Sequence, residues 1–301
     1  MRFIKFHGYG NDYLVFEAAQ LAALGAHAPS AGDVRAEFGP LNEFVRSVCD
    51  RHFGAGADGV ALVEPLESDA SADFRVRIFN HDGTEAAMSG NGSRCAASYL
   101  YFQKLWADDE LRLATRAGVK LYRLRGQTGR GRYRFEAEIG RPLFESAAIP
   151  MLTGEPLAVV RGYPLPLAAD ETIEVTALQM CNPNCCVFVE DFAAVDWRRL
   201  GRLIEAHAQF PAHTNVEFVR VRDRQNIEVR VWERGVGETL SSGTGACASA
   251  VAASLNGLTG RSVGVEMPGG HLEVRWRDDG EVLLTGDAEI VYQGEWRRDE
   301  G

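Results

Sequence analysis

One short pattern occurs twice in this chain, as Glu85-Ala-Ala-Met-Ser89-Gly90-Asn91-Gly92 and again as Glu238-Thr-Leu-Ser-Ser242-Gly243-Thr244-Gly245. Each copy has a glutamate, three further residues and then Ser-Gly-[Asn/Thr]-Gly. Each copy also runs into a small, alanine-rich apolar stretch, and about half of the chain separates the two. A duplicated glycine loop that opens a helix predicts two half-sites that face each other across one cleft.

The pattern suits the binding of an anion. Glycines let backbone N–H groups approach a ligand, because no Cβ stands in the way. The first N–H groups of a helix have no intrahelical partner, and the helix dipole favours a negative charge there. Two such helix starts would hold a carboxylate or a phosphate, with Ser89 and Ser242 on either side of it. One copy alone would indicate only an N-cap and a turn, but two matching copies favour a site.

Size and composition narrow the class of protein. A chain of 301 residues can hold one large domain or two medium ones. Its 46% hydrophobic and 25% charged residues are typical of a soluble globular protein, and no apolar run is long enough for a membrane span. The net charge of −10 disfavours a nucleic-acid partner. The six cysteines show neither disulfide nor metal-site spacing, so we expect reduced thiols, no metal and a cytoplasmic location.

Apolar periodicity predicts many short strands and few helices. In the first half we expect strands at 2–6, 13–17, 60–63, 74–79, 110–114, 118–124 and 132–138, with helices at 41–52 and 91–105. In the second half we expect strands at 186–190, 214–221 and 226–233, helices at 197–207 and after 245, and a strand-rich tail at 264–293. A glycine-rich stretch at 126–131 predicts a hairpin turn. This order indicates an α+β fold with two similar domains, rather than alternating βαβ units.

Further motifs lie along almost the whole chain. They are Phe6-His-Gly-Tyr-Gly-Asn11-Asp12, Asp50-Arg-His-Phe-Gly-Ala-Gly-Ala-Asp58-Gly, Arg77-Ile-Phe-Asn80-His-Asp-Gly-Thr-Glu85, Asn182-Pro183, Asn215, Glu233-Arg234-Gly, Gly237-Glu238-Thr-Leu, Pro268-Gly-Gly270 and Thr285-Gly-Asp. Together they resemble the diaminopimelate epimerases, which are cofactor-independent amino-acid racemases and epimerases. The resemblance implies two pseudo-symmetric α+β domains, each a central helix wrapped by a mostly antiparallel sheet, with the active-site cleft between them. The implied domains are 1–140 with 286–301, and 141–285.

The resemblance also implies a reaction and a ligand site. The reaction is inversion at an amino-acid α-carbon, from LL- to meso-diaminopimelate, with neither pyridoxal phosphate nor a metal. The reacting carboxylate would lie on the helix starts at Gly90-Asn91 and Gly243-Thr244. The far end of the substrate would be held by residues that match Asn11, Asn80, Asn182, Asn215, Glu233 and Arg234. Arginine suits a bidentate carboxylate, whereas Glu233, which we also count as a catalytic candidate, could meet an ammonium group.

The chain departs from the family where the chemistry takes place. The family uses two cysteines: one thiolate removes the α-proton, and the other thiol protonates the opposite face. Ser89 and Ser242 stand at those positions. A thiol has a reference pKa of about 8.5, lowered at a helix N-terminus, whereas a serine needs a neighbouring base. The family also has histidine where this chain has Asn184, and glycine where it has Cys181.

Three explanations are open. In the first, the chain is an engineered variant made to trap a ligand, which accounts for the serines but not for Asn184 or Cys181. In the second, it is a natural homologue that uses other bases to isomerise another amino acid or a peptide, as in natural-product synthesis. In the third, it is a non-catalytic homologue that binds an amino acid or peptide. All three retain the ligand site and predict that the two-thiol activity is absent or reduced.

Several residues near the motifs are candidates for altered chemistry. They are His81, Asp82, Glu85, Asn184, Cys185 and Glu238. His81 either activates Ser89 as a general base or lies on the surface. Cys185 follows the Asn182-Pro-Asn184 loop, although a place in the core is the commoner fate of a free cysteine. We expect a small-molecule partner and a monomer or homodimer.

Overall fold

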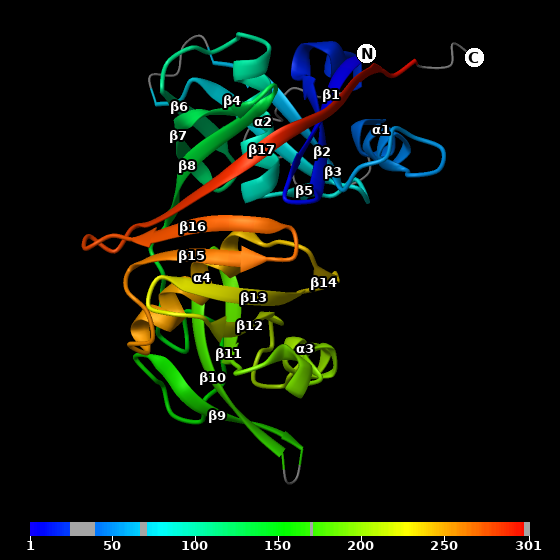
Figure 1. Ribbon diagram of the computed structural model, residues 1–301. Helices are drawn as coiled ribbons and strands as arrows, with labels where there is room; N and C mark the ends of the chain where they lie inside the picture. Colours follow the sequence, from blue (N-terminus) through cyan, green and yellow to red (C-terminus); the bar gives the residue numbers. More distant parts are fainter. Residues whose placement is uncertain (25–39, 67–70, 169–170, 298–301) are drawn as a thin grey trace. The chain divides into compact units, whose positions relative to one another are not determined.

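The computed structural model describes residues 1–24, 40–66, 71–168 and 171–297 (Figure 1). They form two compact units, Met1–Ala137 with Asp287–Gly301, and Glu138–Gly286. Each unit combines a mostly antiparallel set of strands with a long buried helix and a shorter helix. The predicted α+β fold with two similar halves is thereby confirmed.

The first unit is built on strands that wrap the helix α2, Gly90–Phe102. Its strands are β1 Arg2–Gly8, β2 Asn11–Glu17, β3 Gly59–Pro65, β4 Phe74–Asn80, β5 Glu85–Ala86, β6 Glu110–Thr115, β7 Gly118–Gly129 and β8 Arg132–Gly140. The 3-10 helix η1, Ala18–Leu24, and the helix α1, Pro40–Cys49, complete it. The last part of β17, Val282–Glu295, pairs antiparallel with β1.

Strand β2 has helices on both sides. Alternate residues of a strand point to opposite faces. Leu14 and Phe16 join the apolar cluster that α1 covers with Leu41, Phe44, Val45 and Val48. Tyr13 and Val15 therefore point to the other face, against which α2 packs. Because α2 is buried all round from Asn91 to Tyr101, its sequence is rich in small residues instead of amphipathic.

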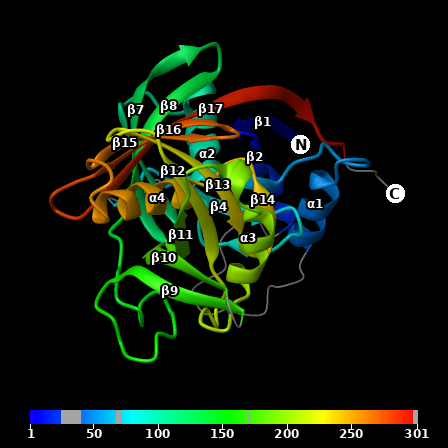
Figure 2. The ribbon, with the colours of Figure 1, turned by 60° about the horizontal axis from the view of Figure 1, so that its bottom comes forward.

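The second unit is built in the same way around α4, Gly243–Leu255. Its strands are β9 Val160–Ala168, β10 Glu171–Met180, β11 Asn182–Phe188, β12 Asn215–Val221, β13 Asn226–Glu233, β14 Gly237–Thr239, β15 Ser262–Met267, β16 Gly270–Trp276 and the start of β17. The 3-10 helix η2, Phe192–Ala194, and the helix α3, Trp197–Glu205, complete it. Helix α4 lies against β10, β11 and β12 (Figure 2), whereas α3 covers the apolar cluster on the opposite face.

The two units repeat one topology. In the first, β1 is antiparallel to β2, β2 is parallel to β3, and β3, β4 and β5 are antiparallel neighbours. In the second, β10, β11, β12, β13 and β14 pair in the same order and with the same directions. The strands after the long helices also correspond, because β6 is parallel to β4 and β15 is parallel to β13. The duplicated sequence pattern therefore marks a duplicated fold.

Among the differences from the sequence prediction, two concern the longer strands. Strands β9 and β10 were not predicted. In β9, Pro164 and Pro166 mask the strand pattern, because proline lacks the N–H donor that a central strand needs. Strand β7 also continues to Gly129, so the turn predicted at 126–131 is confined to its end, where Gly131 has a φ of 75°. In addition, strand β11 begins earlier than the predicted 186–190, and the short strands β5 and β14 were not predicted. None of the helices in the described part of the chain could span a bilayer.

Candidate active site

The half-site of the first unit lies at the start of α2. Ser89 is the N-cap, with φ −134° and ψ 124°, and its Oγ accepts a hydrogen bond from Gly92 N at 3.1 Å. This leaves the amides of Gly90 and Asn91 as the first N–H groups of the helix, which have no intrahelical acceptor. The helix start is therefore suited to an anion, as its sequence predicts.

A buried tyrosine supports Ser89. The hydroxyl of Tyr13, on β2, donates to Ser89 Oγ at 2.9 Å. The Tyr13 ring lies where two glycines leave room: a Cβ added at Gly59 would be 2.7 Å from Tyr13 Cε1, and one at Gly92 would be 3.0 Å from it. Both glycines are thus required by the close approach of the ring, and the ring directs its hydroxyl to the serine.

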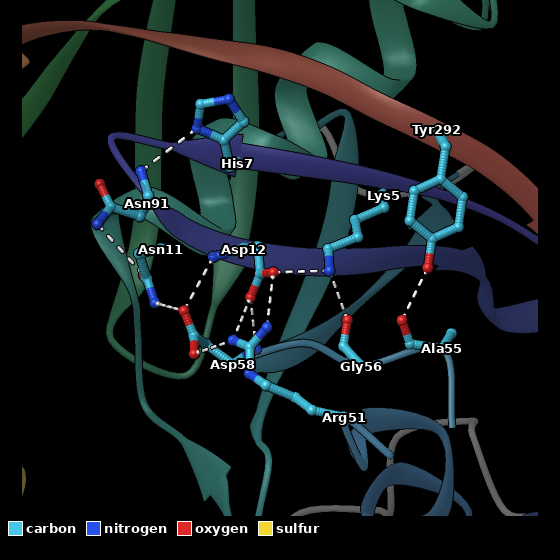
Figure 3. A network of polar contacts seen from close by, with 11 residues as sticks. Lys5, His7, Asn11, Asp12, Arg51, Ala55, Gly56, Asp58, Asn91 and Tyr292 are labelled. Atoms are coloured by element: carbon cyan, nitrogen blue, oxygen red, sulfur yellow. Dashed lines mark hydrogen bonds and ion pairs between the residues drawn. The ribbon is translucent and has the colours of Figure 1, made fainter. Parts of the chain in front are cut away.

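Asn11 and Asn91 are joined in a polar network that is drawn in Figure 3. Asn91 Nδ2 donates to Asn11 Oδ1 at 3.2 Å, and Asn11 Nδ2 donates to Asp58 Oδ2 at 2.8 Å. Asn91 Oδ1 in turn accepts from the guanidinium of the buried Arg94. Both asparagine side chains are therefore held in fixed orientations.

The same network is anchored by ionic contacts (Figure 3). Asp12 Oδ2 lies 2.7 Å from Lys5 Nζ, and Asp12 Oδ1 lies 2.9 Å from an Arg51 nitrogen. Burial acts to raise the pKa of Asp12, but the hydrogen bonds from Arg51 and Lys5 outweigh it and hold that pKa below its ordinary value. A charged aspartate therefore holds Arg51 and the amide of Asp58 in place, and Asp58 in turn holds Asn11.

The other candidates of the first unit lie in the turn between β4 and β5. Asn80 Nδ2 donates to Thr84 Oγ1 at 3.0 Å. His81 is exposed, and within the described ranges no hydrogen bond joins its ring to Ser89. Asp82 accepts from the hydroxyl and the amide of Thr84, which lowers its pKa.

The two glutamates of the repeated pattern are both bound to arginines. Glu85 forms two bonds of 2.9 Å with Arg77. Glu238 forms bonds of 2.6 and 2.8 Å with Arg198. A carboxylate in a bidentate pair is held in place and is a poor candidate for a mobile base. The shared glutamate therefore secures the short strand that precedes each long helix.

The half-site of the second unit has the same local geometry. Ser242 is the N-cap of α4, with φ −134° and ψ 123°, and its Oγ accepts from Gly245 N at 3.1 Å. The Oγ1 atom of Thr244 lies 3.5 Å from Ser242 Oγ. Gly243 and Thr244 contribute the first amides of this helix, as Gly90 and Asn91 do in α2.

Three asparagines and Arg234 form a chain of amides beside this helix. Arg234 N donates to Asn215 Oδ1 at 2.9 Å, and Asn215 Nδ2 donates to Asn184 Oδ1 at 3.4 Å. Asn184 Nδ2 then donates to the backbone oxygen of Asn182 at 2.6 Å. A backbone N–H can only donate, so it fixes the orientation of every amide in the chain. Asn184 and Asn215 are buried, and Asn184 thus orders the residues on either side of it.

A carboxyl group lies buried beside the start of α4. Glu217 has no solvent exposure, and a Cβ added at Gly245 would be 3.0 Å from Glu217 Oε1 and 3.1 Å from Ser242 Oγ. Within the described part of the chain, Oε1 has no hydrogen-bond partner. Burial raises the pKa of Glu217 well above its ordinary value, and the negative charge of Glu233 raises it further.

Three buried cysteines of this chain are unsuited to act as the acid or base in place of the cysteines that the family has at positions 89 and 242. Cys185 belongs to the apolar cluster under α3, and burial raises its pKa well above the ordinary value. Cys95 is fully buried within α2, and burial raises its pKa to about 12. Cys247 is buried within α4. Among the described residues, no group of three or more histidine, cysteine or carboxylate side chains could hold a metal ion.

Cys181 occupies the tight turn between β10 and β11 with a φ of 64°, in the left-handed region. A side chain with a Cβ is strained there, whereas glycine is not. We therefore expect Cys181→Gly to raise the free energy of unfolding by about 1 kcal/mol. Urea unfolding of the variant beside Cys181→Ser measures this, since serine keeps the Cβ. Equal stability of the two variants would contradict the role of backbone strain.

Two residues of the half-sites escaped the sequence analysis. Tyr13 follows Asn11 by two positions, so both point to the same face of β2. Glu217 follows Asn215 by two positions on β12 in the same way. The two-residue period of the strands places each of these residues on the same face as an asparagine of the site. The sequence alone does not show that the long helix covers that face.

Comparisons with known proteins agree with this architecture. The family model described as diaminopimelate epimerase matches residues 3–137 and 176–291. The diaminopimelate epimerase of Desulforudis audaxviator (strain MP104C) is 43% identical over 299 residues, which cover 99% of this chain and 100% of that protein. That of Pelotomaculum thermopropionicum is 42% identical over 296 residues, covering 98% of this chain and 99% of that protein.

Solved structures share the fold at lower identity. A probable proline racemase from Agrobacterium radiobacter K84 superposes with a TM-score of 0.67 at 16% identity, covering 99% of this chain and 93% of that chain. A hydroxyproline epimerase from Agrobacterium vitis gives a TM-score of 0.66 at 17% identity, covering 98% and 90%. With matched motifs over nearly the whole chain and a duplicated α+β topology, the protein belongs to the diaminopimelate epimerase family.

Proposed function

We propose that this chain is an amino-acid epimerase that binds diaminopimelate, and that its serines make α-proton exchange slow. One observation carries the proposal: the two long helices begin with the same N-cap geometry, and each presents a serine hydroxyl beside unpartnered first amides. The proposed ligand places its reacting carboxylate on these helix starts. The choice of substrate is supported by the name diaminopimelate epimerase that relatives 42% and 43% identical to this chain carry.

We assign the far end of the substrate to the amide chain of the second unit. Arg234 is exposed at the turn after β13, where its guanidinium could pair with a second carboxylate. Glu233, next to it, suits the second ammonium group. Asn182 is half-buried at the start of β11, and Asn184 holds it in position. Asn11 and Asn80 contribute from the first unit.

Epimerisation needs one group that removes the α-proton and another that delivers a proton to the opposite face. A serine hydroxyl performs either step only with help from a base. Among the described residues, neither serine is hydrogen-bonded to a carboxylate or an imidazole. We therefore propose that ligand binding is retained, whereas proton exchange is much slower than two thiols would allow.

The same observation favours a second candidate, a homologue that binds an amino acid or a short peptide without turnover. This candidate is supported by the two glutamates nearest the serines in sequence. Glu85 is bonded to Arg77 and Glu238 to Arg198, so neither carboxylate is placed to act as a base for a serine. The two candidates share the ligand site and differ only in whether the α-proton exchanges at all. For both candidates we propose a cytoplasmic location, because none of the six cysteines forms a disulfide and thiols stay reduced there.

Proton NMR in D₂O with LL- and meso-diaminopimelate tests both candidates. We expect the α-proton lines to broaden on binding and to lose intensity slowly. Broadening without any loss would favour the binding protein, and rapid loss would show a working base and contradict slow exchange. Sharp, unchanged lines with both isomers would exclude diaminopimelate as the ligand.

A pair of arginine variants locates the bound molecule. Arg234→Gln should weaken binding by about 10-fold or more, because a charge-assisted pair to the second carboxylate is lost. Arg199→Gln is the matched control, since Arg199 is equally exposed but is paired with Glu171 on the surface. Equal affinity of the two variants would contradict the proposed role of Arg234.

A further inference from the structure

The two serines have different hydrogen-bond environments. Ser89 Oγ accepts from two groups, the Tyr13 hydroxyl at 2.9 Å and Gly92 N at 3.1 Å. Ser242 Oγ accepts from Gly245 N at 3.1 Å, and its second neighbour is the hydroxyl of Thr244 at 3.5 Å, which can donate or accept. The two helix starts therefore have the same backbone geometry, but the side chains that hydrogen-bond to the two serines differ.

The environment of Ser89 leaves its hydrogen for a ligand. A serine oxygen has two acceptor lone pairs and one hydrogen. Tyr13 and Gly92 occupy both lone pairs. Within the described residues nothing accepts the hydrogen of Ser89, although the serine is only half-buried at the helix start. Ser89 is thus an obligate donor toward whatever binds there.

The position of Tyr13 is built into the fold. Its side chain is 5% exposed, and its ring fills the space that Gly59 and Gly92 leave open. In the sheet register Tyr13 pairs with Gly59, and Gly59 pairs with Asn80, so the three stand in one row under α2. The ring cannot swing away from Ser89 without displacing these neighbours.

From these contacts we infer that Tyr13 is a positioning residue that keeps the proton of residue 89 directed toward the ligand and stabilises residue 89 once that proton has been given up. The inference rests on the proposed function for its link to catalysis. In the step itself, the base on the opposite face has removed the first α-proton and left its electron pair on the α-carbon. The bond between hydrogen and the atom of residue 89 then breaks, and that electron pair forms the new C–H bond. The electron pair of the broken bond stays on residue 89, where the Tyr13 O–H and the Gly92 N–H both donate to it. The reverse step returns the proton, so the same contacts serve both directions.

The stabilisation by Tyr13 can be measured without any substrate. In Ser89→Cys, the ultraviolet absorbance of the new thiolate is titrated against pH, with the unsubstituted chain as the blank for its own six thiols. Adding Tyr13→Phe should raise the pKa of the new thiol by about one unit, because one hydrogen bond to a charged group is worth about 1.5–3 kcal/mol. Thermal unfolding verifies that the phenylalanine variants are folded.

A matched pair in the other half-site is the control. Ser242→Cys, with and without Tyr13→Phe, should titrate at the same pH, because Tyr13 bonds to residue 89 and not to residue 242. An unchanged thiol pKa at position 89, or an equal shift at position 242, would overturn the inference. These titrations contain no ligand, so they can succeed even if the proposed function fails.

The catalytic consequence is tested with both thiols present. In Ser89→Cys/Ser242→Cys, adding Tyr13→Phe should lower kcat for α-proton exchange about 10-fold and leave KM nearly unchanged. A rise in KM with constant kcat would show that Tyr13 only shapes the binding site, and would overturn its role in proton delivery.

Discussion

Replacing Ser89 and Ser242 by cysteine together should raise the rate of α-proton exchange in diaminopimelate by about 10³-fold or more. Positioned proton transfer contributes about 10²–10⁴-fold to a rate, and a thiol ionises far more readily than an alcohol. Each helix start further favours the thiolate, because the first amides and the helix dipole lie beside the cap. Loss of the α-proton NMR signal in D₂O measures the exchange rate.

The single variants show whether the two positions act as a pair. Ser89→Cys and Ser242→Cys should each recover much less activity than the double variant, since inversion needs groups on both faces. If the double variant binds the ligand but exchanges no faster than the unsubstituted chain, the serines are not what limits the chemistry. Adding Asn184→His would then test whether the buried amide chain, ending at Asn182, limits it instead.

Glu217→Gln should remove a large pH dependence of stability. Burial first, and then the charge of Glu233, raise the pKa of Glu217 well above its ordinary 4.5, so the folded state keeps a proton that the unfolded chain releases. The stabilisation from this group is complete below pH 4.5 and is lost as the pH rises toward the folded pKa. While the two states differ by one proton, the loss is about 1.4 kcal/mol per pH unit.

Urea unfolding between pH 5 and pH 7 measures this effect as a difference between proteins. The gain in stability of Glu217→Gln over the unsubstituted chain should grow steadily with pH, because glutamine cannot ionise. Glu145→Gln is the control, since Glu145 is exposed and should give a constant, small difference. A Glu217→Gln difference that does not change with pH would show that the buried carboxyl is not protonated in the folded state.

The sequence predicted the helices and the repeated topology well, and physical reasons explain why. The caps at Ser89 and Ser242 are local signals, because a serine followed by glycines and a small apolar run specifies a helix start without tertiary information. Strand β9 lacks such a signal, since its prolines mask the strand pattern even though its partner β10 follows it directly in the chain.

The supporting residues of the half-sites could not be predicted for a different reason. Tyr13 and Glu217 are ordinary members of apolar strands in the sequence. Their importance depends on packing: Tyr13 is directed by two glycines from other elements, and Glu217 is buried by the start of α4. Likewise, Glu85 pairs with Arg77 on β4, and Glu238 pairs with Arg198 on α3. The repeated sequence pattern itself contains neither arginine, so it does not predict these ion pairs.

The serine caps also change how the protein would respond to oxidants. Serine is among the best N-cap residues, and losing such a cap costs a helix about 1 kcal/mol, so these caps favour stability over reactivity. A low-pKa thiol at a helix start is the kind of group that peroxide converts to sulfenic acid, whereas a hydroxyl is inert. Of the six cysteines, five are buried and only Cys181 is exposed. We therefore expect the proposed ligand site to keep its helix caps under peroxide concentrations that would oxidise a cysteine at the same positions.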